Sequence, residues 1–244
     1  NWSPNPNGEV FALAAYTDDM SDTVYVGGAF QSIGSTAVPW FAGVSRSSYG
    51  GAVTWNPGAN NIVRAIAIYG NKILSGGDFI MMGGQSRWRF AASNVVPTGV
   101  TAAVVAGFNP NPNGSVRAIV TDASHTYLGG AFSSAGGAMK YHVARLSSAG
   151  VFDASFDAAV EGDKVNALNI CNDKLLLAGK FNRILGNDRF DLAAIELSNL
   201  QIDSSLPTID PGALEGPEAL ALACPAGGFA VGGSFSSFLS LFDF

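Results

Sequence analysis

The sequence has few charged residues, which make up 13% of its 244 residues. Globular domains commonly carry about 25% charged residues. Lysine and arginine total only 13, against 19 aspartates and glutamates, and the net charge is −6. Binding to nucleic acid and electrostatic attachment to anionic membranes both depend on clustered basic residues. The charge balance therefore argues against nucleic acid and membrane surfaces as partners.

Long hydrophobic runs and abundant cysteines are also missing. No apolar run approaches the roughly 18 residues of a membrane-spanning helix, so we expect no membrane insertion. The only cysteines are Cys171 and Cys224, which excludes a disulfide-rich scaffold. A bridge between them and two unpaired thiols both stay open at this stage. The chain begins at Asn1 rather than methionine, as expected of a processed chain or a segment of a longer one.

Recognisable catalytic motifs are absent as well. The two histidines, His125 and His142, lie near predicted strands, and we interpret them as strand-surface residues. No Gly-x-Ser-x-Gly elbow occurs, and no glycine-rich phrase precedes a predicted helix, as a phosphate loop would. The acidic run at 18–22 is interpreted as a solvated turn rather than a cation site. The sequence therefore predicts no enzyme activity, no catalytic residue, no metal site and no cofactor.

What the sequence does contain is a repeat built on a glycine pair followed by phenylalanine. The phrase ends at Phe30, Phe79, Phe132, Phe181 and Phe235, about every fifty residues. An alternating apolar stretch precedes it each time, at 9–16, 62–69, 115–122, 164–171 and 217–224. A third apolar stretch follows each phrase, and an aromatic residue or leucine marks each unit at Trp2, Trp55, Phe108, Phe156 and Leu206.

Each unit thus holds about four short apolar stretches separated by turn residues, which is the pattern of a propeller blade. We predict an all-β, five-bladed β-propeller with about four strands per blade, in a single domain spanning 1–244. The predicted blades are 2–54, 55–107, 108–155, 156–205 and 206–244. A solenoid is disfavoured because its repeats are shorter, and a pair of sandwiches because it would not repeat its phrases.

The last unit stops soon after its third stretch, so the ring needs a strand from elsewhere. We expect the N-terminal segment around Trp2 to complete blade five, because propellers commonly hide the seam in this way. The alternative is that the chain belongs to a longer array.

These phrases resemble the delta-60 repeat propellers of secreted bacterial proteins, over essentially the whole chain. The residues that carry the resemblance include the aromatic–Asn–Pro phrase at Trp55 and the Gly-Gly-x-Phe phrase ending at Phe79. The resemblance implies an extracellular or cell-surface protein, and it implies no biochemical activity.

Two sets of residues are candidate binding surfaces. The first is an apolar protein interface, because exposed apolar patches mark contacts between proteins; it comprises Phe79, Ile80, Met81, Met82, Phe238, Leu239, Leu241 and Phe242. The second is a set of aromatic platforms for sugars, at Trp40, Trp88, Tyr141 and Phe190. Packing between blades is the alternative interpretation of these aromatic residues.

The leading hypothesis is a non-catalytic extracellular module for assembly or adhesion, with protein partners or copies of itself, as a subunit of a larger surface or filamentous structure. A carbohydrate-binding lectin is the second hypothesis. A propeller-based hydrolase or lyase is the third, and no cluster of acids or histidines supports it.

Overall fold

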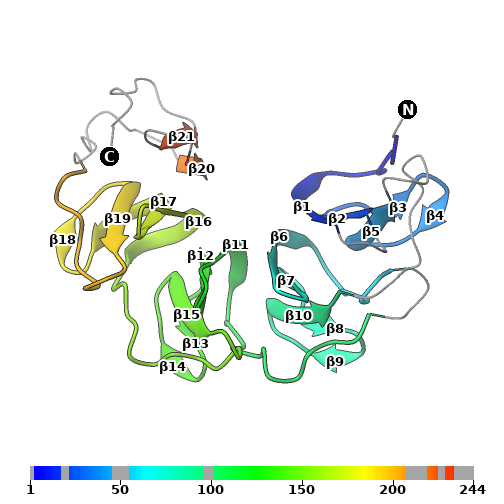
Figure 1. Ribbon diagram of the computed structural model, residues 1–244, viewed down its shortest axis with the longest axis horizontal. Coiled ribbons are helices and arrows are strands. Elements are labelled where there is room, and N and C mark those ends of the chain that lie inside the picture. The colour runs from blue at the N-terminus through cyan, green and yellow to red at the C-terminus, as the bar shows by residue number, and fades with distance from the viewer. Residues whose placement is uncertain are drawn as a thin grey trace.

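The computed structural model describes residues 3–17, 22–45, 55–95, 102–206, 219–224 and 229–233. All regular secondary structure in these ranges is β-strand, and the strands form a series of antiparallel sheets (Figure 1). The prediction of an all-β chain is therefore confirmed. Within the same ranges the structure contains no helix of the length and apolarity needed to cross a membrane.

The sheets stand side by side along an arc, and we call them blades one to five in chain order (Figure 1). The inner strands are β1 (Val10–Thr17), β6 (Val63–Tyr69), β11 (Ser115–Thr121), β16 (Glu161–Cys171) and β20 (Ala219–Ala223). The middle strands are β2 (Asp22–Gly28), β7 (Lys72–Gly77), β12 (His125–Ala131), β17 (Lys174–Ile184) and β21 (Ala230–Gly233). The outer strands are β5 (Phe41–Ser45), β10 (Phe90–Asn94), β15 (Val143–Ser147) and β19 (Leu192–Glu196).

Short hairpins follow the middle strands. They are β3 (Ser32–Ile33) with β4 (Thr36–Ala37), β8 (Met81–Met82) with β9 (Gln85–Ser86), and β13 (Ser134–Ala135) with β14 (Ala138–Met139). In blade four, β18 (Asn187–Asp188) pairs with the end of β17 instead. Each group of strands falls within one of the predicted repeats.

In blades two, three and four the expected fourth strand is reduced to a single bridge. The outer strands pair with the next segment through Ser93–Val104, Leu146–Phe152 and Ile195–Ile202. The side chains of Asp153 and Asp203 each accept a hydrogen bond of 2.9 Å from the backbone N–H two residues later. Such turns end an extended strand, so pairing stops after one bridge in blades three and four.

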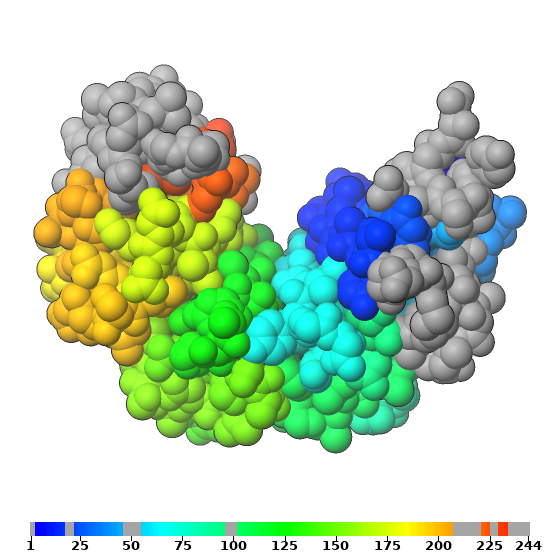
Figure 2. Space-filling view, in the orientation of Figure 1, coloured from blue at the N-terminus to red at the C-terminus, as the bar shows by residue number. Residues whose placement is uncertain are grey.

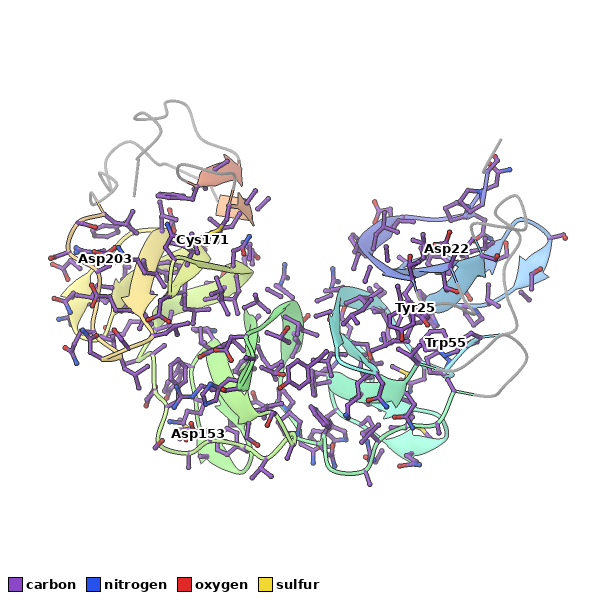
Figure 3. The ribbon with its side chains drawn as sticks, in the orientation of Figure 1. Asp22, Tyr25, Trp55, Asp153, Cys171 and Asp203 are labelled. Carbon is purple, nitrogen blue, oxygen red and sulfur yellow. A yellow bond between two sulfur atoms is a disulfide. The ribbon has the colours of Figure 1, made fainter. Side chains whose placement is uncertain are left out.

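The marker residues of the repeats that the structure describes pack between two blades, whereas Trp2 lies outside the described residues. The Trp55 ring lies 4.7 Å from the Tyr25 ring and 5.0 Å from the Phe41 ring, in edge-to-face contacts that join blades one and two (Figure 3). Phe156 makes the same kind of contact with Tyr127, at 5.8 Å between centroids. Phe108 is buried between blades two and three, and Leu206 is buried between blades four and five. The marker residues therefore form the core between blades.

The two glycines of each pair are required for different structural reasons. A Cβ on the first glycine, Gly76, would lie 2.5 Å from Val116 Cγ1 of the next blade. A Cβ on the second, Gly77, would lie 2.1 Å from the carbonyl oxygen of Ile62 on its own inner strand. The same arrangement recurs at Gly27 and Gly28 and at Gly129 and Gly130. The first glycine thus lets blades approach closely, and the second lets strands approach closely.

An asparagine in the segment before each of the first three inner strands fixes the start of the hairpin in the same blade. The Asn60 side-chain oxygen accepts hydrogen bonds from the N–H groups of Ile80 and Met81, at 2.9 and 3.0 Å. Asn7 and Asn113 bind the equivalent N–H groups in blades one and three. Each repeat therefore holds its own leading segment against its own hairpin.

A disulfide joins Cys171 at the end of β16 to Cys224 just after β20, with 6.0 Å between the Cα atoms. Figure 3 places Cys171 on the side of blade four that faces β20. The bridge settles the state of the two cysteines and ties blade four to blade five.

In the part of the chain that the structure describes, the first and last blades are not in contact. Figures 1 and 2 show β1 on one side of the opening and β20 with β21 on the other. Trp2, expected to help close the ring, lies outside the described residues. The residues that follow it bind to blade one itself: Pro6 forms a bridge with Ile33, and the Asn7 N–H donates to the Ser32 carbonyl. Closure by the N-terminal segment stays a prediction.

Candidate functional site

A β-bulge displaces one residue on each of the first four inner strands. The pairing of inner and middle strands shifts register by one residue at the same position in every one of these blades. Bulges turn the displaced side chain out of the regular sheet alternation and are common at functional sites. The displaced residues, which we call the bulge row, are Phe11, Arg64, Arg117 and Asn166.

Members of the bulge row touch across the junctions between blades. The Arg64 guanidinium carbon lies 5.2 Å from the centroid of the Phe11 ring, a cation–π contact between blades two and one. Arg117 Nη1 donates to Asn166 Oδ1 at 3.3 Å, between blades three and four. The bulge row therefore follows the inner side of the arc, where the inner strands lie (Figure 1).

Asp78 is the carboxylate that binds Arg64. It accepts hydrogen bonds from Arg64 Nε and Nη2 at 2.9 and 2.7 Å, and Arg89 Nη1 donates to its backbone carbonyl. Burial alone would raise the pKa of Asp78, but hydrogen bonds from Arg64 and Ser115 and the charges of Arg64 and Arg89 outweigh it and lower the pKa. Asp78 is therefore ionised at neutral pH and supplies one negative charge among several arginines.

The second unusual surface is the face of β1 that borders the opening. Leu13 is 62% exposed, Phe11 43% and Val10 38%, although all three belong to a strand. In blade four the residue at the position of Leu13 is Leu168, which packs against Gly129 of the preceding blade. Among the described residues no other blade covers this end face, Val10, Phe11 and Leu13, so in that part of the chain it is one half of a blade junction without its other half.

The complementary half is found at the opposite end of the array. Gly232 in β21 occupies the place in the repeat that Gly27 and Gly76 hold in earlier blades. Among the described residues, a Cβ on Gly232 would meet only the Ala221 Cβ, at 3.7 Å. The glycine surface of blade five is therefore uncovered by the described part of the chain.

The predicted apolar interface is divided by the structure. Phe79 and Met82 are fully buried, whereas Ile80 and Met81 are 46% and 41% exposed at the start of the β8–β9 hairpin. Only two of the four residues can therefore contact a partner. The other predicted interface residues lie outside the described residues: Phe238, Leu239, Leu241 and Phe242.

The predicted sugar platforms do not form one set. Trp88, Tyr141 and Phe190 share a position in the repeat, two residues before the outer strand. Trp40 lies one residue further on, where the backbone has positive φ, as at Arg89 and His142. Trp88 and Tyr141 are 50% and 44% exposed, and Trp40 and Phe190 are half-buried. Trp88, Tyr141 and Phe190 belong to three different blades. Among the described residues no contact joins their rings.

A pocket of about 410 Å³ lies between blades three and four. The Tyr127 hydroxyl in the wall of this pocket donates a hydrogen bond to Asp122 Oδ2 at 3.1 Å. The backbone N–H of His125 donates to Asp122 Oδ1 at 2.6 Å. Burial, followed by the charge of Asp122, raises the pKa of Tyr127 to about 12. The hydroxyl is therefore protonated at neutral pH. In the described part of the chain, no three metal-ligating side chains come together.

The histidine interpretation needs one correction. His125 begins β12 with a side chain about one third exposed, as expected of a surface residue. His142, in contrast, is only 8% exposed and lies just before β15 with a φ of 66°. Burial is the first cause of its lowered pKa. It is therefore a neutral core residue at a tight turn.

Sequence reasoning missed the bulge row and the end face. Aligning the first apolar stretch of each repeat would have placed Phe11, Arg64, Arg117 and Asn166 in one column between a valine and an alanine. That column holds arginine or asparagine in three of the four phrases, between residues that are apolar in all four. The exposure of Leu13 has no such signal, because the equivalent residues Ile66, Ile119 and Leu168 are apolar as well and are partly or fully buried.

Comparison with known proteins leaves the chain without a demonstrated family. No protein-family model matches it, and no curated protein matches it. Solved structures with similar folds include the Pan2 WD40 domain of Neurospora crassa, at 11% identity and a TM-score of 0.44, over 81% of this chain and 65% of that one. Another is the computationally designed Ika8 protein, at 10% identity and a TM-score of 0.38, over 98% of both chains. The chain thus spans just under two thirds of the Pan2 structure, and neither likeness indicates a function.

Proposed function

We propose that the chain is a non-catalytic interaction module that assembles with protein partners, and that the end face of β1 is its docking surface. The observation that carries the proposal is the exposure of Val10, Phe11 and Leu13 on a strand whose equivalents are covered in later blades. Contiguous apolar surface of this kind marks contacts between proteins.

The occupant that we propose for the end face is a second copy of the chain. The same molecule carries the complementary glycine surface at Gly232, so two copies can form the junction that joins neighbouring blades within one chain. Burying one exposed leucine side chain contributes about 1.5–3 kcal/mol. Only 13% of the residues are charged, and this low content is in keeping with a molecule whose surface is partly covered by another copy.

Light scattering on wild type and two matched variants tests the proposal. Leu13 and Met139 are both 62% exposed, but Met139 lies in the β13–β14 hairpin, away from the end face. We expect the wild type to self-associate with rising concentration above its monomer mass of 25.1 kDa. We expect Leu13→Asp to weaken self-association about tenfold or more, and Met139→Asp to leave it unchanged.

Two results would contradict the proposal. In one, the wild type is monomeric at all concentrations. In the other, Leu13→Asp and Met139→Asp weaken self-association equally. A monomer that Leu13→Asp destabilises far more than Met139→Asp would mean that the end face closes onto blade five of the same chain.

The proposal includes an extracellular or cell-surface setting. The Cys171–Cys224 disulfide supports it, because structural disulfides persist in oxidising compartments. The resemblance to secreted delta-60 repeat propellers points the same way. Mass measurement of native material after thiol alkylation, with and without prior reduction, tests it: two alkylated cysteines before reduction would argue for a reducing compartment.

A carbohydrate-binding role is the second candidate. Trp88 and Tyr141, exposed at the same position on neighbouring blades, favour it. A glycan array distinguishes the two roles. Binding that Trp88→Ala abolishes would favour the carbohydrate role, and no binding by wild type would exclude sugars of the arrayed kinds.

A further inference from the structure

One position at the end of the inner-strand phrase connects a blade to the blade that follows it. In blade two the Tyr69 hydroxyl donates to the backbone carbonyl of Ala123 in blade three, at 2.9 Å. In blade one Tyr16 packs against the apolar cluster between blades one and two. In blade four Cys171 forms the disulfide with Cys224. Each of these residues lies six positions after the first valine of its phrase, so the repeat uses this position to span the junction.

Blade three departs from this rule, because the equivalent residue is Asp122. Its side chain turns back on its own blade. It accepts hydrogen bonds of 2.6 Å from the backbone N–H groups of Ser124 and His125, and one of 3.1 Å from the Tyr127 hydroxyl. The side chain that spans the other junctions is therefore missing between blades three and four.

The pocket of about 410 Å³ lies at this junction. Asp122 and Tyr127 belong to its wall in blade three, and Ile170, Asp173 and Leu197 belong to its wall in blade four. Its volume falls in the range of roughly 300–1,000 Å³ that is typical of ligand sites. The pocket extends from the end of one inner-strand phrase to the turn of the next blade, which is the space that Tyr69 spans one junction earlier.

The walls of the pocket combine apolar surface with one available hydrogen-bond acceptor. Burial alone would raise the pKa of Asp122, but the hydrogen bonds from Ser124, His125 and Tyr127 lower it, so the carboxylate is ionised at neutral pH. Each carboxylate oxygen can accept two hydrogen bonds. In the described part of the chain, Oδ1 accepts two and Oδ2 accepts one, which leaves room for one more donor. Ile170 and Leu197 pack against the core cluster of blades three and four and supply the apolar surface.

We propose that this pocket receives a tyrosine side chain from a partner protein. A phenol ring offers the apolar body and the single hydroxyl donor that these walls match, and it is the group that the chain itself places at the preceding junction, in Tyr69. A peptide is favoured over a free phenol because Ser124 and Asp173, which also line the pocket, are exposed and can bind a peptide backbone. The proposal rests on the role of the chain as an interaction module, and it adds a site that a second copy at the end face of β1 does not use.

Nuclear magnetic resonance of the methyl groups of Ile170 and Leu197 tests the site directly. The probe is a capped tripeptide with tyrosine between two glycines, and the same peptide with phenylalanine is the control probe. We expect the tyrosine peptide to shift both sets of methyl signals as it is titrated. The phenylalanine peptide should bind about tenfold more weakly or less, because the hydrogen bond to a charged acceptor is lost.

Two variants fill the pocket from opposite walls. Asp122→Tyr restores the residue type of blades one and two and should abolish binding of the peptide. Leu197→Trp should also abolish it, with Ile170 as the reporter, and it leaves the hydrogen bonds of Asp122 in place if Asp122→Tyr does not fold. The matched control is Asp188→Tyr, which makes the same change of charge and side chain at a residue that is 76% exposed and pairs with Arg183 away from the pocket.

The proposal is wrong if the tyrosine peptide shifts neither set of methyl signals at about 10 mM, or if the phenylalanine peptide binds equally well. It is also wrong if Asp188→Tyr weakens binding as much as Asp122→Tyr, or if free p-cresol binds as tightly as the peptide, since the ligand would then be a small phenol. Leu13→Asp separates this proposal from self-association: it should disrupt self-association and leave binding of the tyrosine peptide unchanged.

Discussion

Replacing Gly76 by alanine should destabilise the junction between blades two and three. The new Cβ would lie 2.5 Å from Val116 Cγ1 and 3.2 Å from Ile119 Cδ1. Val116 is fully buried and β-branched, so its side chain has little rotamer freedom with which to move away. The first glycine of each pair is therefore a packing requirement between blades.

Overpacking by one methyl group in a well-packed core costs about 1–3 kcal/mol. We expect Gly76→Ala to lower the free energy of unfolding by about 2 kcal/mol, measured by urea denaturation with an unchanged slope. Gly107→Ala is the matched control, because its new Cβ would meet only the Ala149 carbonyl oxygen, at 3.4 Å. That variant should be neutral or slightly stabilising, since alanine restricts the unfolded chain.

A double-mutant cycle identifies the cause. Val116→Ala alone should cost about 2 kcal/mol through lost burial, yet it opens the space that the methyl group introduced by Gly76→Ala needs. The double variant should therefore be more stable than the sum of the single effects predicts, by at least about 1 kcal/mol. Additive effects, or equal costs for Gly76→Ala and Gly107→Ala, would refute the proposed contact between blades.

Two further predictions concern charge and the disulfide. Burial raises the pKa of Asp153, but hydrogen bonds from Ser155 and Arg145 outweigh it and lower the pKa from 3.8 to about 2. The carboxylate therefore stabilises the fold above pH 3.8, and this contribution is lost as pH falls toward 2. Asp153→Asn should make the urea midpoint of unfolding less dependent on pH between these two values. A variant whose midpoint falls with pH as steeply as that of the wild type would contradict the pairing with Arg145. Reduction of Cys171–Cys224, which are 53 residues apart, removes at most about 4 kcal/mol of loop-closure stabilisation. Amide exchange should then quicken in β20 and β21 and stay constant in β6, whereas uniform quickening would show that the bridge holds the whole array.

The strands could be predicted from the sequence because each apolar stretch recurs in every repeat and is bounded by similar turn residues. The glycine pairs and the markers such as Trp55 recur at fixed places in the repeat, and the structure gives each of them a contact between strands or blades. The fourth strand was overestimated because a fourth apolar stretch recurs in the repeat, whereas the turns at Asp153 and Asp203 limit pairing to one bridge in blades three and four.

The candidate site was harder to predict for a physical reason. A bulge depends on two strands losing register, and neither strand shows this by itself. The period-two pattern around Arg64 therefore suggested an ordinary strand residue, whereas the shift between Val63 and Ala65 displaces it from the regular alternation. Similarly, the positive φ at Trp40 separates it from Trp88, although both are tryptophans before an outer strand.

The unlike surfaces of each blade give the whole array a direction. A valine and a larger apolar residue project from one side, and a glycine receives them on the other, as Val116 and Ile119 meet Gly76. Duplicating one repeat would add a blade that fits both of its new neighbours and leave the surfaces at the two ends unchanged. The length of such an array can therefore change by whole repeats during evolution without any new kind of contact between blades. The end face of β1 keeps the same residues whatever that length is.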